Sequence, residues 1–272
     1  MMKEKEMIPA SGPGVHTGSD GRLYCNVCGE ARQVRLTFGD KSVTVPCNCA
    51  CLEKQWQQRQ DDLHRQEELD RIERSRVAAI PDSELRWQRF ESSEYDSRGI
   101  QIARNYAHQW SQMESRGQGL LLWGPPGTGK TYAAACIANA LVDRKVPVLM
   151  GNLSQMLGAI PAPASGEQAG AIDRLLQCSL LVLDDLGAER SSAYINELVY
   201  RIIDGCYRAG KPMVITTNLT MQELEHPETK DRGRIYQRIL ERCTPVLMNE
   251  NTIREDKRKQ NQKFAREVLV NQ

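Results

Sequence analysis

The sequence contains the eight-residue stretch Gly124, Pro125, Pro126, Gly127, Thr128, Gly129, Lys130 and Thr131. This stretch matches the pattern G-x-x-x-x-G-K-[ST], a loop whose glycines let backbone N–H groups turn toward phosphate oxygens. An apolar run at 120–123 precedes the loop, and a segment rich in helix-forming residues follows it at 132–141. A phosphate-binding loop requires this order of strand, loop and helix. The alternative is that the stretch is an ordinary Gly/Pro turn that precedes a helix. We therefore predict a nucleotide site at this loop.

Three residues at the end of the loop have predicted roles in binding ATP. Lys130 is expected to reach the β- and γ-phosphates, and the Thr131 hydroxyl is expected to be a ligand of Mg²⁺. Tyr132, the next residue, completes the predicted nucleotide-binding set. The N-terminus of the following helix adds a positive dipole, which favours a bound anion.

Polar side chains also follow two further apolar runs. The run at 180–183 leads to Asp184 and Asp185, and the run at 213–217 leads to Asn218. In a parallel α/β sheet the ligand crevice lies at the carboxyl ends of the strands. We expect Asp184 to help hold Mg²⁺, Asp185 to orient or deprotonate the attacking water, and Asn218 to sense the γ-phosphate. By themselves, such residues are also typical of ordinary turns.

Apolar strand patterns and amphipathic helix patterns alternate from residue 97 onward. The expected strands are 120–123, 146–150, 180–183, 213–216 and 245–248. The expected helices are 97–114, 130–142, 153–157, 171–177, 193–207 and 235–242. This alternation predicts an α/β fold with a parallel sheet flanked by helices.

Five of the nine cysteines lie close together near the N-terminus, at Cys25, Cys28, Cys47, Cys49 and Cys51. Clustered cysteines in a reducing compartment indicate metal ligands, and four thiolates are the ligand set of a closed, structural zinc site. Cys25 and Cys28 form a C-x-x-C pair. Two of the remaining three are needed, and the sequence favours Cys51 without deciding between the others. His16 and His64 are reserve ligands that are more simply explained as surface residues.

The segment between these cysteines has the pattern of a hairpin. Residues 34–38 and 42–45 alternate around Gly39-Asp40-Lys41, so the unit resembles a small zinc ribbon. Such a unit needs its metal in order to fold, and it would present a surface to a partner protein or to nucleic acid.

Composition excludes several classes of protein. The chain has 272 residues and a formal net charge of +1, so no global field demands a nucleic-acid or membrane partner. No apolar run is long enough to span a bilayer, and the N-terminus lacks the pattern of a secretory signal, which predicts a cytoplasmic protein without a membrane partner. The expected organisation is a flexible tail (1–20), a zinc-binding module (21–52), a helical linker (53–84), an ATPase domain (85–254) and a basic C-terminal tail (255–272).

The three strand-end motifs, in this order and with Gly187-Ala188-Glu189 after the acids, resemble the AAA+ ATPases of the bacterial and phage DnaC/DnaI type, the replicative helicase loaders. The resemblance covers about residues 90–254. In such ATPases an arginine of one subunit completes the site of its neighbour. The resemblance implies that Arg238, or else Arg234, acts in this way, and that Arg254 is a second sensor within its own subunit. Asp185 stands where many of these proteins carry Glu, which implies slower hydrolysis.

The resemblance also implies partners and a function. The protein is expected to self-associate into an AAA+ oligomer and, with ATP, to assemble on a DnaB-like hexameric helicase and single-stranded DNA during replication initiation. An accessory ATPase of DNA transposition (IstB type) and a zinc-dependent nucleic-acid-binding adaptor with a regulatory nucleotide site remain alternatives. The basic residues available to contact DNA are Arg254, Lys257, Arg258, Lys259, Lys263 and Arg266, although a solvated terminal helix explains them equally well.

Overall fold

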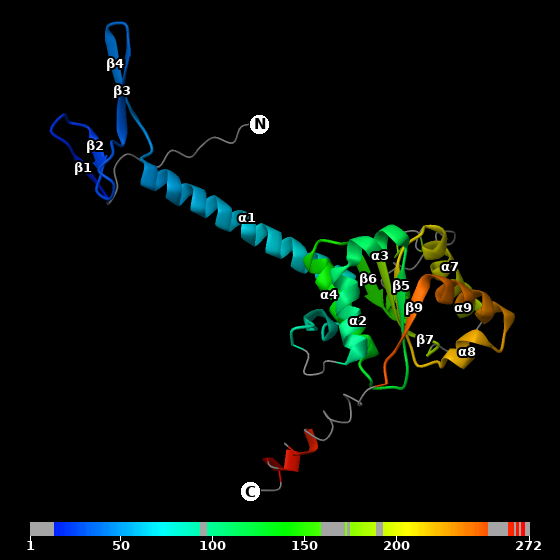
Figure 1. Ribbon diagram of the computed structural model, residues 1–272. Coiled ribbons are helices and arrows are strands. Elements are labelled where there is room, and N and C mark those ends of the chain that lie inside the picture. The colour runs from blue at the N-terminus through cyan, green and yellow to red at the C-terminus, as the bar shows by residue number, and fades with distance from the viewer. Residues whose placement is uncertain are drawn as a thin grey trace. The chain divides into compact units, whose positions relative to one another are not determined.

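The computed structural model describes residues 14–92, 97–158, 172, 175–188, 193–249, 261–263, 265–266 and 268–269. The chain divides into two compact units, Met1–Asp70 and Arg71–Gln272. Helix α1 (Ala50–Ala79) begins in the first unit and ends in the second, and it includes most of the helical linker expected at 53–84 (Figure 1).

The first unit contains two antiparallel hairpins. Strand β1 (Val15–Thr17) pairs with β2 (Leu23–Cys25), and β3 (Gln33–Phe38) pairs with β4 (Lys41–Pro46). Phe38 lies opposite Lys41, so the turn between them consists of Gly39 and Asp40, with Gly39 at a φ of 59°. Glycine adopts this left-handed conformation without steric cost, which explains why the predicted hairpin turns here.

The second unit is built on a five-stranded parallel sheet in the order β6-β7-β8-β5-β9. Its strands are β5 (Gly119–Trp123), β6 (Val148–Gly151), β7 (Leu180–Leu186), β8 (Met213–Thr217) and β9 (Cys243–Leu247). This arrangement confirms the predicted α/β fold class. Strands β7, β8 and β5 are neighbours, so their carboxyl ends meet at one edge of the sheet.

Helices cover both faces of this sheet (Figure 1). Helices α2 (Arg98–His108), α3 (Trp110–Arg116) and α4 (Lys130–Asp143) pack on one face. Helices α5 (Leu153–Gly158), α7 (Ala193–Arg208), α8 (Met221–Glu225) and α9 (Lys230–Arg242) pack on the other. A short 3-10 turn, η1 (Leu85–Trp87), lies between α1 and α2 along the chain.

Strand β5 shows how the apolar sequence produces two cores. Leu120 and Leu122 belong to the core beneath α2 and α4, whereas Leu121 belongs to the core beneath α7 and α9. Successive side chains of a strand point to opposite faces, so a strand covered on both sides must be apolar throughout.

The structure differs from one of the helix predictions. The helix expected at 97–114 is two helices, because the backbone leaves helical geometry at Gln109 (φ −90°, ψ 21°), and Trp110 is then buried in the core with 3% exposure. Within the helix expected at 171–177, residues 171, 173 and 174 lie outside the described residues, and 176 and 177 form a turn.

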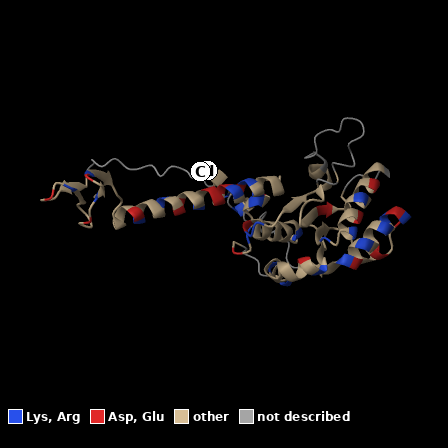
Figure 2. Cartoon of the chain, turned by 90° about the horizontal axis from the view of Figure 1, so that it is seen from above, with Lys and Arg blue, Asp and Glu red and all other residues tan. Residues whose placement is uncertain are grey.

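Acidic and basic residues are interspersed along α1 (Figure 2), as expected for a solvated helix. Among the described residues, no helix has both the length and the apolar character needed to cross a membrane.

Candidate functional site

The phosphate loop follows β5 and leads into α4. Gly124, Gly127 and Gly129 have φ values of 140°, 87° and 88°, so each occupies a conformation that disfavours other residues. At Gly124 a Cβ atom would lie 2.3 Å from the carbonyl oxygen of Met248, so the residue after β9 also excludes a side chain there. The loop therefore needs these glycines to expose its N–H groups at the α4 N-terminus.

The loop's polar side chains turn inward. Lys130 is only 5% exposed, and its Nζ donates to the carbonyl oxygens of Gly124 (2.8 Å) and Pro125 (2.7 Å). The Thr128 hydroxyl also donates to the Pro125 carbonyl, at 2.9 Å. The ammonium group thus lies inside the curve of the loop, where a bound phosphate would compete for it.

Thr131 and Asp184 bring the first two motifs together. The Thr131 Oγ1 donates to Asp184 Oδ1 at 2.9 Å, and the Thr216 Oγ1 donates to the same oxygen at 2.6 Å. Burial raises the pKa of Asp184, and the two hydroxyls partly offset this by donating to the charged form. A hydroxyl facing a carboxylate is an oxygen pair that suits Mg²⁺, so the predicted ligands fit the ion.

Strand β7 has an irregularity at the acidic pair, Asp184 and Asp185. The register between β7 and β8 shifts between Leu183 and Leu186, and Asp185 has a φ of 55° within this stretch. The Asp185 N–H donates to Thr216 Oγ1 at 2.9 Å. Aspartate tolerates left-handed backbone better than glutamate does, which gives a local reason for the shorter acid at this position.

One pocket brings the motifs together. Its lining residues are Leu85, Gln88, Pro126, Gly127, Gly129, Lys130, Thr131, Tyr132, Asp185 and Asn218. Asn218 and Asp185 thus face the same space as the phosphate loop, as the strand-end argument expects. Leu85 and Gln88 were not predicted from the sequence, because they precede the phosphate-loop motif by over thirty residues. Thr216 was not predicted either; it is fully buried and bonds both acids, and a hydroxyl inside an apolar strand was the available signal.

The three candidate arginines have different environments. Arg238 forms an ion pair with Asp204 (2.8 Å), donates to the Tyr200 hydroxyl (3.1 Å) and stacks over the ring of Tyr200. Arg234, one turn earlier on α9, is exposed. Arg254 lies outside the described residues.

Four of the five clustered cysteines converge. The Sγ atoms of Cys25, Cys28, Cys49 and Cys51 all lie within 4.8 Å of one another. Cys47 instead points its Sγ at the Ala31 carbonyl, 3.2 Å away. The described structure therefore groups the second pair as Cys49 and Cys51.

The geometry of this cluster fits a tetrahedral metal. Four thiolates at about 2.3 Å from zinc lie roughly 3.8 Å apart, close to the separations seen. The N–H groups of Cys28 and Val27 donate to the Cys25 sulfur and lower its pKa to about 6, which favours the thiolate that binds metal. His16 bonds Asn26 at 2.7 Å and His64 lies near Glu67 on α1, so neither joins the cluster.

A parallel sheet with a phosphate loop after β5, an acidic pair in β7 and an amide after β8 defines a P-loop nucleotide-binding protein of the AAA+ class. The chain belongs to the family of IstB-like ATP binding proteins, which matches residues 49–261.

Individual relatives agree with this assignment. The replicative helicase loader DnaC of Escherichia coli (strain K12) is 28% identical over 141 residues, which cover 50% of this chain and 57% of DnaC. A putative ATP-binding protein in an insertion sequence of Mycobacterium tuberculosis (strain ATCC 25618 / H37Rv) is 28% identical over 103 residues, 38% of this chain and 41% of that protein. The crystal structure of DnaI matches with a TM-score of 0.52 and 26% identity, covering 63% of this chain and 93% of the chain in that structure. The chain thus spans about half the length of the curated relatives that it matches.

Proposed function

We propose that the protein binds ATP with Mg²⁺ and hydrolyses it. The observation that carries this proposal is the 2.9 Å contact between Thr131 and Asp184, which joins the phosphate loop after β5 to the acidic pair of β7, with β8 between the two strands. Lys130 would exchange its loop carbonyls for phosphate oxygens. Bound Mg²⁺, held by Thr131 and Asp184, would neutralise phosphate charge.

The residues beyond the ion have separate roles in this proposal. Asp185 and Asn218 line the same pocket, where a carboxylate can accept a proton from water and an amide can orient that water against the γ-phosphate. The Asp185 N–H donates to Thr216 Oγ1, so the backbone that carries this carboxylate at the pocket is anchored to β8.

We propose that Arg234 completes the site of a neighbouring subunit. It is exposed on α9, whereas Arg238 is already paired with Asp204 in its own chain. A guanidinium that must reach another subunit has to be accessible, so the environment favours Arg234 over the first choice made from sequence. Arg254 remains a proposed sensor.

We propose that this ATPase loads a ring-shaped replicative helicase onto single-stranded DNA. The support is the similarity to DnaC and DnaI, relatives that cover about half to two-thirds of this chain. ATP would favour the assembled oligomer on helicase and DNA, and hydrolysis would release it.

The cysteine-rich unit is proposed to bind zinc through Cys25, Cys28, Cys49 and Cys51 and to contact the helicase. On the β3–β4 hairpin, Val34, Leu36 and Phe38 share one face with Val43, and these side chains are 39%, 41%, 70% and 52% exposed. An exposed apolar face favours a protein partner over nucleic acid, which is recognised chiefly through basic groups. Replacing Phe38 by Asp is expected to weaken helicase binding without loss of zinc.

The alternative of a transposition ATPase is favoured by one comparison, the relative encoded in an insertion sequence. The two functions differ in partner. Under the loader proposal the purified protein binds the hexameric replicative helicase of its own source, whereas under the alternative it binds a transposase.

One reconstitution tests the loader proposal. Helicase is incubated with circular single-stranded DNA, MgATP and either the wild-type protein or the Lys130→Ala variant, and DNA-bound helicase is separated by gel filtration. We expect wild-type protein to increase helicase on the circles and Lys130→Ala to fail. Equal amounts with and without the protein would contradict loading. DNA binding without ATP turnover in either protein would favour the adaptor.

A further inference from the structure

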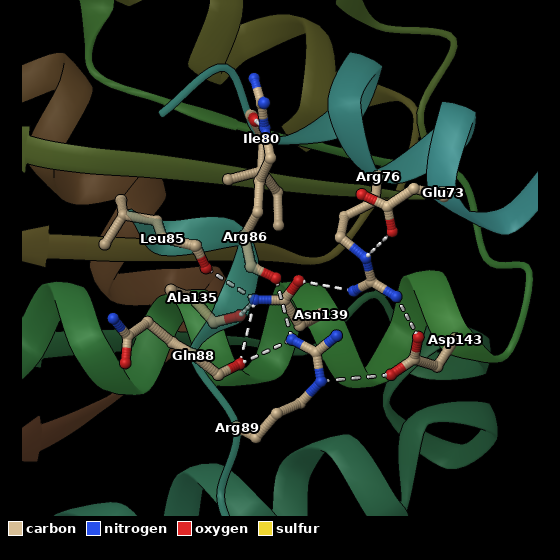
Figure 3. Close-up of polar contacts among 10 residues, drawn as sticks. All are labelled: Glu73, Arg76, Ile80, Leu85, Arg86, Gln88, Arg89, Ala135, Asn139 and Asp143. Carbon is tan, nitrogen blue, oxygen red and sulfur yellow. Dashed lines mark hydrogen bonds and ion pairs between the residues drawn. The ribbon is translucent and has the colours of Figure 1, made fainter. Parts of the chain in front are cut away.

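A buried arginine lies at the end of α1 and contacts the helix of the phosphate loop. Arg76 is only 4% exposed, and its Nε donates to Glu73 at 3.0 Å. Its Nη1 donates to Asn139 Oδ1 at 2.7 Å, and its Nη2 contacts Asp143 (Figure 3). A buried guanidinium is costly unless its donors are satisfied, and here three side chains satisfy it.

Asn139 is fully buried in the middle of α4, and its orientation is determined by its neighbours. A guanidinium can only donate, so the amide oxygen must face Arg76. The amide nitrogen then faces the carbonyl oxygens of Leu85 (2.8 Å), Gln88 (3.1 Å) and Ala135 (3.0 Å). Arg76 therefore fixes which way Asn139 donates, as Figure 3 shows.

Those carbonyls belong to the wall of the nucleotide pocket. Leu85 and Gln88 line the pocket together with the phosphate loop. The same segment has a second attachment to α4, because the Tyr132 hydroxyl donates to the Arg89 carbonyl at 2.6 Å. Since α4 begins at the loop, the position of Asn139 along α4 sets where this wall stands relative to bound phosphates.

Helix formation and core packing do not explain an asparagine here. Asparagine is a poor helix former, and its neighbours at 133–135 and 138 are alanines that pack in the core without polar groups. A buried polar group favours one arrangement of its neighbours when all its hydrogen bonds are made. Asn139 forms hydrogen bonds through both the oxygen and the nitrogen of its amide, so it can hold the neighbouring segments in one arrangement.

We propose that Asn139 and Arg76 are positioning residues for nucleotide binding. They hold the Leu85–Gln88 backbone against α4 and thereby place the wall that the base and ribose contact, while the loop itself holds the phosphates. This inference rests on the proposed binding of ATP. It assigns a role in nucleotide binding to Arg76 at the C-terminal end of α1, which lies outside the nucleotide-binding motifs.

The test compares two ligands on three full-length proteins by titration calorimetry. The ligands are MgATP and magnesium tripolyphosphate, which lacks base and ribose. Asn139→Asp keeps an oxygen for Arg76 but turns a second oxygen toward the Leu85 and Gln88 carbonyls. Gln118→Glu is the matched control, because the Gln118 amide donates to the Arg242 carbonyl (3.0 Å) at the opposite end of β5.

We expect Asn139→Asp to weaken MgATP binding by about ten-fold, since two buried carbonyls lose their donor. Its affinity for tripolyphosphate should stay within two-fold, and Gln118→Glu should change neither. Equal losses for both ligands, or no loss for either, would overturn the positioning role. Wild-type protein that binds no MgATP would instead refute the proposed function.

Hydrogen exchange of the wild-type protein provides a second test if Asn139→Asp does not fold. MgATP should slow the exchange of amide hydrogens at 72–80 and 85–89. The reason is that nucleotide binding would order the pocket wall and the C-terminal end of α1 together. Tripolyphosphate should protect only the phosphate loop. The same exchange at 72–89 with MgATP as without it would contradict the proposal.

Discussion

The hydroxyl of Thr131 lies 2.9 Å from Oδ1 of Asp184, although 53 positions separate the two residues in the chain. The contact forms because α4 starts next to the end of β7, with β8 between β5 and β7 in the sheet. It places the two expected Mg²⁺ ligands together at one edge of the sheet.

Asp184→Asn is expected to separate stability from ligand binding. Burial disfavours the Asp184 charge, so removing that charge should leave the unfolding temperature without nucleotide unchanged or slightly higher. MgATP at one hundred times its Kd should raise the free energy of unfolding of the wild-type protein by about 2.7 kcal/mol. The increase for the variant should be far smaller. Thermal unfolding with and without MgATP measures both effects. A wild-type response in the variant would show that Asp184 is not needed for the metal–nucleotide complex.

Asp185→Asn should affect turnover alone. Asparagine tolerates the left-handed backbone found here, so the fold and the bond to Thr216 should persist. Loss of a proton acceptor typically costs about 10²–10⁴-fold in rate, so steady-state hydrolysis should fall by that factor while MgATP affinity stays within a few-fold. A rate close to that of the wild type would exclude Asp185 as the base.

Cys47 and Cys49 provide a matched pair for the metal site. Cys49 lies in the sulfur cluster, whereas Cys47 points at the Ala31 carbonyl. Protein carrying Cys47→Ser should retain one zinc per chain, and protein carrying Cys49→Ser should lose it, as measured by metal analysis of purified material. Zinc loss from both variants, or from Cys47→Ser alone, would contradict the proposed ligand set.

Arg238→Ala should destabilise the protein. Arg238 pairs with Asp204, which is 14% exposed, and stacks on Tyr200, so its removal should cost about 1–3 kcal/mol in the free energy of unfolding. Arg208 still pairs with Asp204 in the variant, which limits the loss. Chemical denaturation of the two proteins measures the difference, and an unchanged midpoint would show that the network contributes nothing.

Arg234→Ala should instead leave stability unchanged and reduce hydrolysis in the assembled protein, by about 10³-fold or more if this arginine acts in trans. Mixing the Arg234→Ala and Lys130→Ala proteins is a direct check. Where the two meet, one interface combines Lys130 of the first protein with Arg234 of the second and so contains an intact site. Recovery of turnover on mixing supports Arg234 as the trans residue. Two inactive proteins that stay inactive when mixed would contradict it.

The strands and the phosphate loop could be predicted because their signals are local. The apolar run at 180–183 forms the first part of β7 and is buried on both faces of the sheet. The glycines of the phosphate loop lie within the motif itself and adopt the positive φ values that it requires. The two-helix structure around Gln109 was not predictable in this way, because helical spacing continues through the break while the burial of Trp110 is a tertiary effect.

Other features of the site depend on contacts between distant residues. Nothing near Cys47 in the sequence distinguishes it from Cys49, and only the fold shows that it faces Ala31. The spacing of Arg234 and Arg238 on α9 does not show that Asp204 on α7 has already paired with one of them. Asn139 resembles a neutral helix residue until Arg76, 63 positions earlier, is found beside it.

Titration calorimetry of the zinc-loaded, full-length protein with MgATP tests the central claim most directly. We predict saturable binding near one nucleotide per chain for the wild type and none measurable for Lys130→Ala, which lacks the ammonium held inside the loop. Folded wild-type protein that releases or absorbs no binding heat at several temperatures would contradict the assignment of this pocket to ATP.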